Sequence, residues 1–163
     1  MIKNKILKQV VDGIEQKVEP EMRGAYDRIV TAGLKIMFGE ETHDMMAKEL
    51  EKEGDIATNV ADGISRLIAL LYVKSKETMP IPAAILASIT LMAEALDFAE
   101  RKMGVPVTND VVDAAAEATA EQVLRKFGVT PENLQQLVSN VQQGQSGAQA
   151  PTQSQPQGGL LGA

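Results

Sequence analysis

The chain has 163 residues, a net charge of −6 and no cysteine. The length fits one domain, and the lack of cysteine excludes disulfides, thiolate zinc sites and cysteine nucleophiles. The acidic balance argues against a dedicated nucleic-acid-binding protein, because affinity for phosphates depends on clustered Lys and Arg.

Three amphipathic helices are predicted in the first third of the chain. Residues 2–18 place isoleucine and valine at four-residue spacing, which predicts a helix. Pro20 suits the first turn of a second helix over residues 20–38, and Gly39 suits its end. A third, shorter helix is expected over residues 42–52. Its narrow apolar face consists of Met45, Met46 and Leu50.

The strongest helical periodicity follows Asp55, which suits a helix cap, and predicts a fourth helix over residues 56–76. Pro82 can begin a fifth helix over residues 83–103. That helix is apolar nearly all round in its first three turns and carries charge only from Glu94 onward. We therefore expect its N-terminal half to be buried and its C-terminal half to face the surface. The short link predicts an antiparallel hairpin of these two helices at the centre of the fold.

Two more helices are predicted before the C-terminus. The segment 108–110 is a dense capping signal for a sixth helix that reaches Phe127 and stops at Gly128. The segment 130–132 supplies a threonine cap, a proline and an acid for a last helix. One face of that helix carries Leu134, Leu137, Val138 and Val141.

The last stretch, residues 142–163, carries no charge and ends in two adjacent leucines followed by Gly and Ala. Its Gln, Gly, Ser and Pro cannot bury enough apolar surface to fold alone, so we expect a disordered spacer with a leucine anchor. The partner-binding candidates are therefore Leu160 and Leu161, together with Leu134, Leu137, Val138 and Val141.

The composition supports the fold class that these segments predict. Aromatic residues make up 3% of the chain, whereas it has eight methionines, so we expect aliphatic and thioether packing between helices in place of a sheet. The prediction is an all-α, compact bundle of six to seven helices over residues 1–141, with a disordered tail over residues 142–163. Alanines of the fifth and sixth helices suit close packing within the chain or against a neighbouring subunit. The longest uncharged run of the bundle, residues 78–93, is too short for a transmembrane segment.

Two acidic clusters in the sequence are candidate sites. His43 stands beside Glu40, Glu41 and Asp44, which is a solvated helix start more often than a metal site. A carboxylate stripe along the sixth helix predicts a solvated face, with a docking stripe for a basic partner as the alternative. It consists of Asp110, Asp113, Glu117 and Glu121.

The first helix begins with Lys3, Lys5 and Lys8 beside its apolar stripe. Such a helix can lie on an anionic membrane or insert into a groove of a partner, but packing on the bundle is the default expectation. No phosphate-binding loop, nucleophile elbow or zinc-protease motif occurs. We therefore predict no catalytic residue, no cofactor and no metal.

A helical body of this size, the segment Met79-Pro80-Ile81-Pro82-Ala83 leading into an apolar helix, and the uncharged end from Gln153 to Leu161 together resemble small helical structural proteins of tailed bacteriophages. The resemblance implies a head-to-tail adaptor, a minor virion component or an ejected protein, present in several copies around a symmetric assembly. It implies a place in the virion, or in the host cytoplasm during assembly. It carries over no site residue.

We therefore expect a non-enzymatic structural or assembly protein that docks through its helical body and its tail. Its partners would be further copies of itself or other virion proteins. The alternative is a cytosolic, chaperone-like binding module that holds a protein client through adaptable methionines. These are Met22, Met37, Met45, Met46, Met79, Met92 and Met103.

Overall fold

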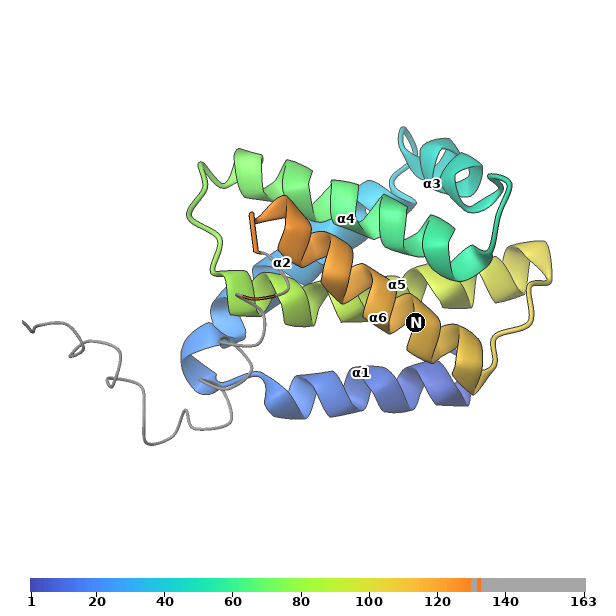
Figure 1. Cartoon of the computed structure of the whole chain (residues 1–163), viewed down its shortest axis with the longest axis horizontal. Coiled ribbons are helices and arrows are strands. Elements are labelled where there is room, and N and C mark those ends of the chain that lie inside the picture. Colours follow the sequence, from blue (N-terminus) through green and yellow to red (C-terminus); the bar gives the residue numbers. More distant parts are fainter. Residues whose placement is uncertain (130–131, 133–163) are drawn as a thin grey trace, which may run out of the picture. The chain divides into compact units, whose positions relative to one another are not determined.

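The computed structural model describes residues 1–129 and residue 132. The chain divides into two units, Met1–Phe127 and Gly128–Ala163. In the described residues the protein is all-α, which confirms the predicted fold class (Figure 1). The helices are α1 (Lys5–Lys17), α2 (Pro20–Phe38), α3 (His43–Leu50), α4 (Ile56–Lys74), α5 (Ile81–Met103) and α6 (Asn109–Lys126). The predicted domain boundary at residue 141 lies outside the described residues.

Local signals set most helix ends where the sequence predicts them. The Asp55 carboxylate accepts a hydrogen bond from the Thr58 N–H at 3.1 Å and so caps α4. Thr108 caps α6 in the same way, with its hydroxyl 3.3 Å from the Val111 nitrogen. At the C-terminal end of α5, Gly104 adopts the left-handed conformation that commonly ends a helix, with φ at 71°.

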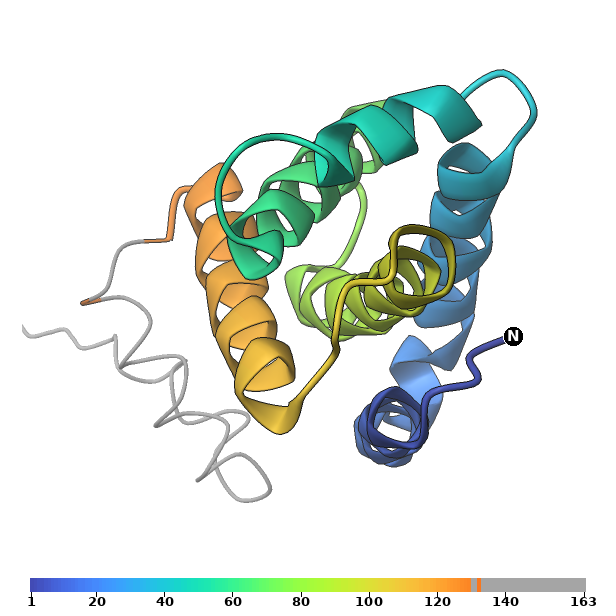
Figure 2. The ribbon, with the colours of Figure 1, turned by 90° about the vertical axis from the view of Figure 1, so that its right-hand side faces the viewer.

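Helix α5 is the centre of the bundle. It packs against α1, α2, α4 and α6, and Figure 2 shows α2 and α6 on opposite sides of it. The prediction that its C-terminal half faces the surface is wrong. From Leu91 to Ala99 every residue is buried except the half-buried Glu94. The charged residues in this half of α5 predicted an exposed side, but α1 packs against α5 there.

Small side chains let the other helices approach α5 closely. Gly33 of α2 faces Leu91 of α5, and a Cβ built at Gly33 would lie only 2.6 Å from Leu91 Cδ1. Leu91 is itself fully buried, so its side chain can make room only by moving within the packed core. The buried alanines Ala83, Ala84, Ala87, Ala93, Ala95 and Ala99 of α5, and Ala115 of α6, have no exposed surface. Their packing is within the chain, as the first of the two alternatives predicted.

The N-terminal segment is tied to α5 through a buried carboxylate. Asp97 has no exposed side-chain surface and forms an ion pair with Arg101 at 2.7 Å. Its Oδ1 accepts hydrogen bonds from the backbone N–H of Lys3 at 2.8 Å and of Asn4 at 3.1 Å. The Asn4 side chain in turn caps α1 by accepting from the Ile6 and Leu7 N–H groups. The cap explains why α1 begins at Lys5 and not at the first isoleucine.

Burial of the Asp97 carboxylate raises its pKa, but the hydrogen bonds from the Lys3 N–H, the Arg101 guanidinium and the Asn4 N–H together outweigh burial. The pKa is therefore lowered from its ordinary value. A carboxylate with a lowered folded-state pKa contributes its full stabilisation above the unfolded-state pKa of about 3.9. That stabilisation is lost as the pH falls through the folded-state pKa.

Helices α4 and α5 are the two described helices that are long and apolar enough to cross a membrane by length and composition alone. In the fold, 50% of the most apolar window of α4 and 72% of that of α5 are buried. Helix α4 packs along α6, where the Ser65 hydroxyl lies 3.1 Å from Gln122 Oε1. Half or more of each apolar window therefore lies in the core of the bundle.

The close approach of α2 to α5 predicts opposite effects of the same substitution at two glycines. Gly33→Ala should lower the free energy of unfolding by about 1–3 kcal/mol, because the new methyl group overlaps the side chain of the fully buried Leu91. Gly13→Ala should raise it by about 0.5–1 kcal/mol, because nothing lies within 4 Å of the new Cβ on α1. Denaturant unfolding measures both, and equal effects at the two positions would contradict the close packing.

Removing the Asp97 carboxylate should loosen the N-terminal segment. Asp97→Ala should lower the free energy of unfolding at neutral pH by about 2–4 kcal/mol, because two backbone N–H groups lose their acceptor. The loss should shrink as the pH falls below about 4, where the wild-type carboxylate also begins to lose its contribution. Asp113→Ala, which removes an exposed carboxylate from α6, should change stability by less than about 0.5 kcal/mol. A pH-independent difference between Asp97→Ala and wild type would be the contrary result in denaturant titrations.

Candidate docking groove

An apolar groove of about 230 Å³ lies where α2, α3 and α4 meet. We call it the methionine groove. It is lined by Ile36, Met37, Thr42, Met45, Met46, Glu49, Gly63, Arg66, Leu67 and Leu70. Three of its ten lining residues are methionines, and they are contributed by α2 and α3.

The α3 wall of the groove is anchored at both ends. At its start, the His43 ring meets the edge of Phe98, with the ring centroids 5.3 Å apart. At its end, Leu50 is buried, with 3% of its surface exposed. His43 is therefore a half-buried packing residue and not the solvated helix start that the sequence predicted. Within residues 1–129, no group of three His, Cys, Asp or Glu side chains is arranged to hold a metal ion.

The α4 wall comes from residues spaced three and four apart, which lie on one face of a helix. They are Gly63, Arg66, Leu67 and Leu70. Gly63 lets α3 come close, because a Cβ there would lie 3.0 Å from Cγ of Glu49. The Glu49 carboxylate then pairs with Arg66 at 3.0 Å and with Lys52 at 2.7 Å. The pair with Arg66 joins α3 to α4, whereas Lys52 lies in the turn after α3, and these partly exposed ion pairs contribute at most about 1 kcal/mol each.

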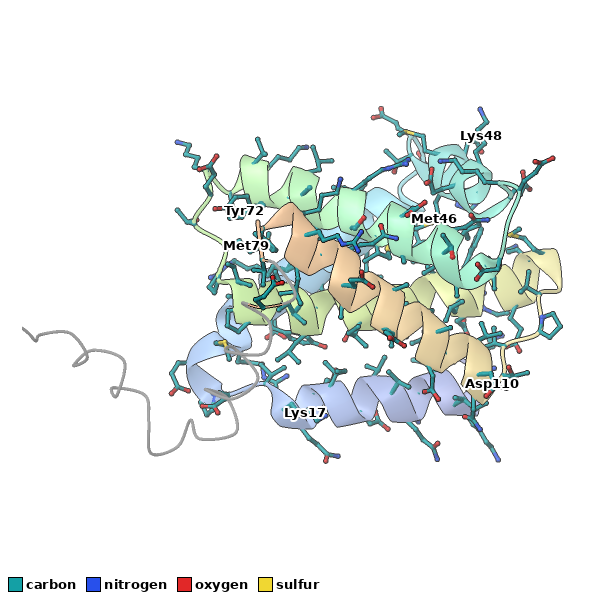
Figure 3. The ribbon with its side chains drawn as sticks, viewed as in Figure 1. Lys17, Met46, Lys48, Tyr72, Met79 and Asp110 are labelled. Atoms are coloured by element: carbon teal, nitrogen blue, oxygen red, sulfur yellow. The ribbon has the colours of Figure 1, made fainter. Side chains whose placement is uncertain are left out.

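The groove is apolar at its floor and at its rim. Met37 and Leu67 form a buried floor, with 2% and 7% of their surfaces exposed. Met45 and Leu70 form a rim that remains 68% and 44% exposed. Figure 3 shows Met46 on the side of α3 toward α4, and Lys48 on its outer side. An exposed apolar rim above a buried apolar floor is typical of a surface that receives another apolar group.

The segment that forms α3 and its flanking turns is strongly acidic. Residues 40–55 contain seven Asp and Glu but only two Lys, a net charge of −5 out of −6 for the whole chain. Glu40, Glu41 and Asp44 are exposed at the start of α3. The same short segment therefore supplies the methionines of the α3 wall and most of the net negative charge of the chain.

The predicted partner-binding residues lie elsewhere in the chain. Leu134, Leu137, Val138, Val141, Leu160 and Leu161 are all outside the described residues. Among the seven methionines of the alternative hypothesis, Met79 and Met92 are buried in the core and Met22 and Met103 are half-buried away from the groove. Only Met37, Met45 and Met46 come together in it.

The two charged surfaces that the sequence singled out are packed or solvated as expected. Asp110, Asp113, Glu117 and Glu121 are all exposed on α6, and Glu121 forms an ion pair with Arg125. The lysines near the start of α1 are also exposed, while Leu7 on its apolar stripe is fully buried. The default prediction that α1 packs on the bundle is confirmed.

Sequence reasoning missed the α4 side of the groove. Leu70 belongs to an apolar surface on α4 that is wider than one stripe, and the same surface includes the exposed Val73. A count of apolar positions around the helix would have shown these two leftover side chains. The place of Gly63 against Glu49 gives no sequence signal, because it depends on how α3 folds back.

The chain matches no protein-family model, no curated protein and no solved structure.

Proposed function

We propose that the protein is a non-enzymatic binding protein that receives an apolar segment of another protein in the methionine groove. The observation that carries this proposal is the exposed pair Met45 and Leu70 above the buried floor of Met37 and Leu67. Methionine side chains are flexible and polarizable, so a groove lined by them adapts to the shape of its occupant.

The size of the groove suits one or two large side chains. A dry apolar cavity of about 150 Å³ holds a benzene molecule, and the groove measures about 230 Å³. The ends of an amphipathic helix or of a short apolar segment fit such a volume. Burial of one Leu or Met side chain contributes about 1.5–3 kcal/mol.

This function can be tested with two neutral substitutions at the rim. Met45→Gln combined with Leu70→Gln keeps the side-chain size but makes the rim polar, and should lower the affinity for the partner at least tenfold. Both side chains are exposed, so stability should change by less than about 1 kcal/mol. Affinity purification with quantitative mass spectrometry, from the cells that make the protein, measures the difference.

Val73→Gln is the matched control, since Val73 is 66% exposed on the same helix but does not line the groove. It should retain every partner that the wild type retains. If no protein is lost specifically from the double variant, the groove is not the docking site.

A second candidate function is favoured by the sequence of the C-terminal stretch. We propose that the protein serves as a structural or assembly component of a tailed bacteriophage particle, in which Leu160 and Leu161 anchor an uncharged spacer on a neighbour. The groove would give the helical body a docking surface in such an assembly as well. The client-binding alternative needs the groove but not the particle.

Mass spectrometry of purified particles separates the two settings. The particle role predicts a fixed number of copies in each particle, and deletion of residues 144–163 should lower that number while leaving the thermal unfolding of the helical body nearly unchanged. Absence of the chain from particles contradicts the particle role. Unchanged incorporation of the shortened chain removes the leucine anchor from it.

A further inference from the structure

We propose that the occupant of the methionine groove is a basic amphipathic helix of a partner protein, with apolar side chains on one face and Lys or Arg on the others. This inference rests on the proposed function, because it names the chemistry of the partner for the same groove. It combines the exposed apolar rim with the charge of the segment that builds it.

The segment that forms the α3 wall of the groove is acidic on balance. Residues 40–55 carry a net charge of −5, whereas the remaining residues of the chain sum to −1. Glu40, Glu41 and Asp44 are exposed in the turn and first helical turn that lead to Met45. A partner with basic residues beside its apolar anchors is attracted to this rim, and a partner with acidic residues is repelled.

The two charged side chains that line the groove itself, Glu49 and Arg66, balance each other. Arg66 is the basic residue that lines the groove from α4, and its guanidinium lies 3.0 Å from the Glu49 carboxylate. Glu49 also holds Lys52 at 2.7 Å. The net negative charge near the groove therefore comes from the exposed Glu40, Glu41 and Asp44, which precede Met45 in the chain.

The shape of the site favours a helix over an extended strand. A strand binds by adding to the edge of a sheet, and the part of the chain that the structure describes contains no strand. The groove is instead bounded by three helices, and its exposed anchors, Met45 and Leu70, are side chains with no backbone edge beside them. Helix-in-groove binding uses such side-chain contacts, with anchors three or four residues apart.

The two occupants that the chain itself offers fit less well. Residues 142–163 end in two leucines but carry no basic residue. A second copy would bring the same acidic segment to the interface if it docked through the same face. Both remain distinct outcomes of the experiment below.

The test uses the full-length chain and two synthetic peptides of about 18 residues, or five helical turns. Both carry the same leucine stripe, and their polar positions are Lys in one and Glu in the other. We expect the Lys peptide to bind at least tenfold more tightly than the Glu peptide at low salt, as measured by fluorescence anisotropy. This preference should shrink severalfold between about 0.05 M and about 0.5 M salt.

Two sets of variants assign the binding to the groove. Met45→Gln with Leu70→Gln should weaken Lys-peptide binding roughly tenfold. Glu40→Gln, Glu41→Gln and Asp44→Asn together should reduce the preference for Lys over Glu roughly threefold or more. The matched control removes three exposed acids from α6, by Asp110→Asn, Asp113→Asn and Glu117→Gln, and should leave both affinities nearly unchanged.

The contrary outcomes separate the inference from the proposed function. Equal binding of both peptides, lost in the Met45 and Leu70 variant, keeps the docking groove but overturns the basic partner. If the Met45 and Leu70 variant binds the Lys peptide with the same affinity as the wild type, the binding is general attraction to an acidic protein, and the inference is overturned. Self-association that disappears in the groove variant, measured by analytical ultracentrifugation, assigns the groove to another copy and also overturns it. Binding of neither peptide contradicts the inference and leaves the purification experiment to decide the groove.

Discussion

The burial of α5 on all sides is the constraint on which the rest of the structure depends. Helices can pack closely around a central helix where the side chains at the contacts are small. Here small residues occur both on α5 and on its neighbour α2. Gly33 lets α2 approach Leu91, and the fully buried alanines of α5 leave room for α6. The buried Asp97 is tolerated at this centre because backbone N–H groups and Arg101 satisfy it.

The same constraint explains why a groove remains beside α3. Four helices pack around α5, and the short α3 packs mainly on α2 and α4, reaching α5 through the contact of His43 with Phe98. It is attached by His43 and Leu50 at its two ends, and among the described residues no helix covers the exposed Met45 between them. An apolar surface is thereby left in the most acidic part of the chain. The groove lies where α3 packs against α2 and α4, and the segment that forms α3 carries most of the net charge of the chain.

Features that depend on neighbouring residues were predictable from the sequence. The caps at Asp55 and Thr108 and the proline at the start of α2 need only a few adjacent side chains, and each stands where the periodicity places it. Features that depend on distant partners were not. From the sequence alone, Asp97 is expected at the surface. Its burial depends on the Lys3 and Asn4 N–H groups, which are more than ninety residues away in the chain. In the groove, the methionines of α3 were visible in the sequence, but their pairing with Leu70 and Gly63 was not.

The central claim is that one groove on the bundle is the docking surface, and the methionines themselves are its most direct probes. With ¹³C-labelled methionine methyl groups, NMR spectra of the full-length chain can be recorded with and without the Lys-bearing leucine-stripe peptide. The account predicts that the methyl signals of Met37, Met45 and Met46 shift, while those of the core residues Met79 and Met92 stay in place. Equal shifts at all methionines, or shifts that spare Met45 and Met46, would contradict it.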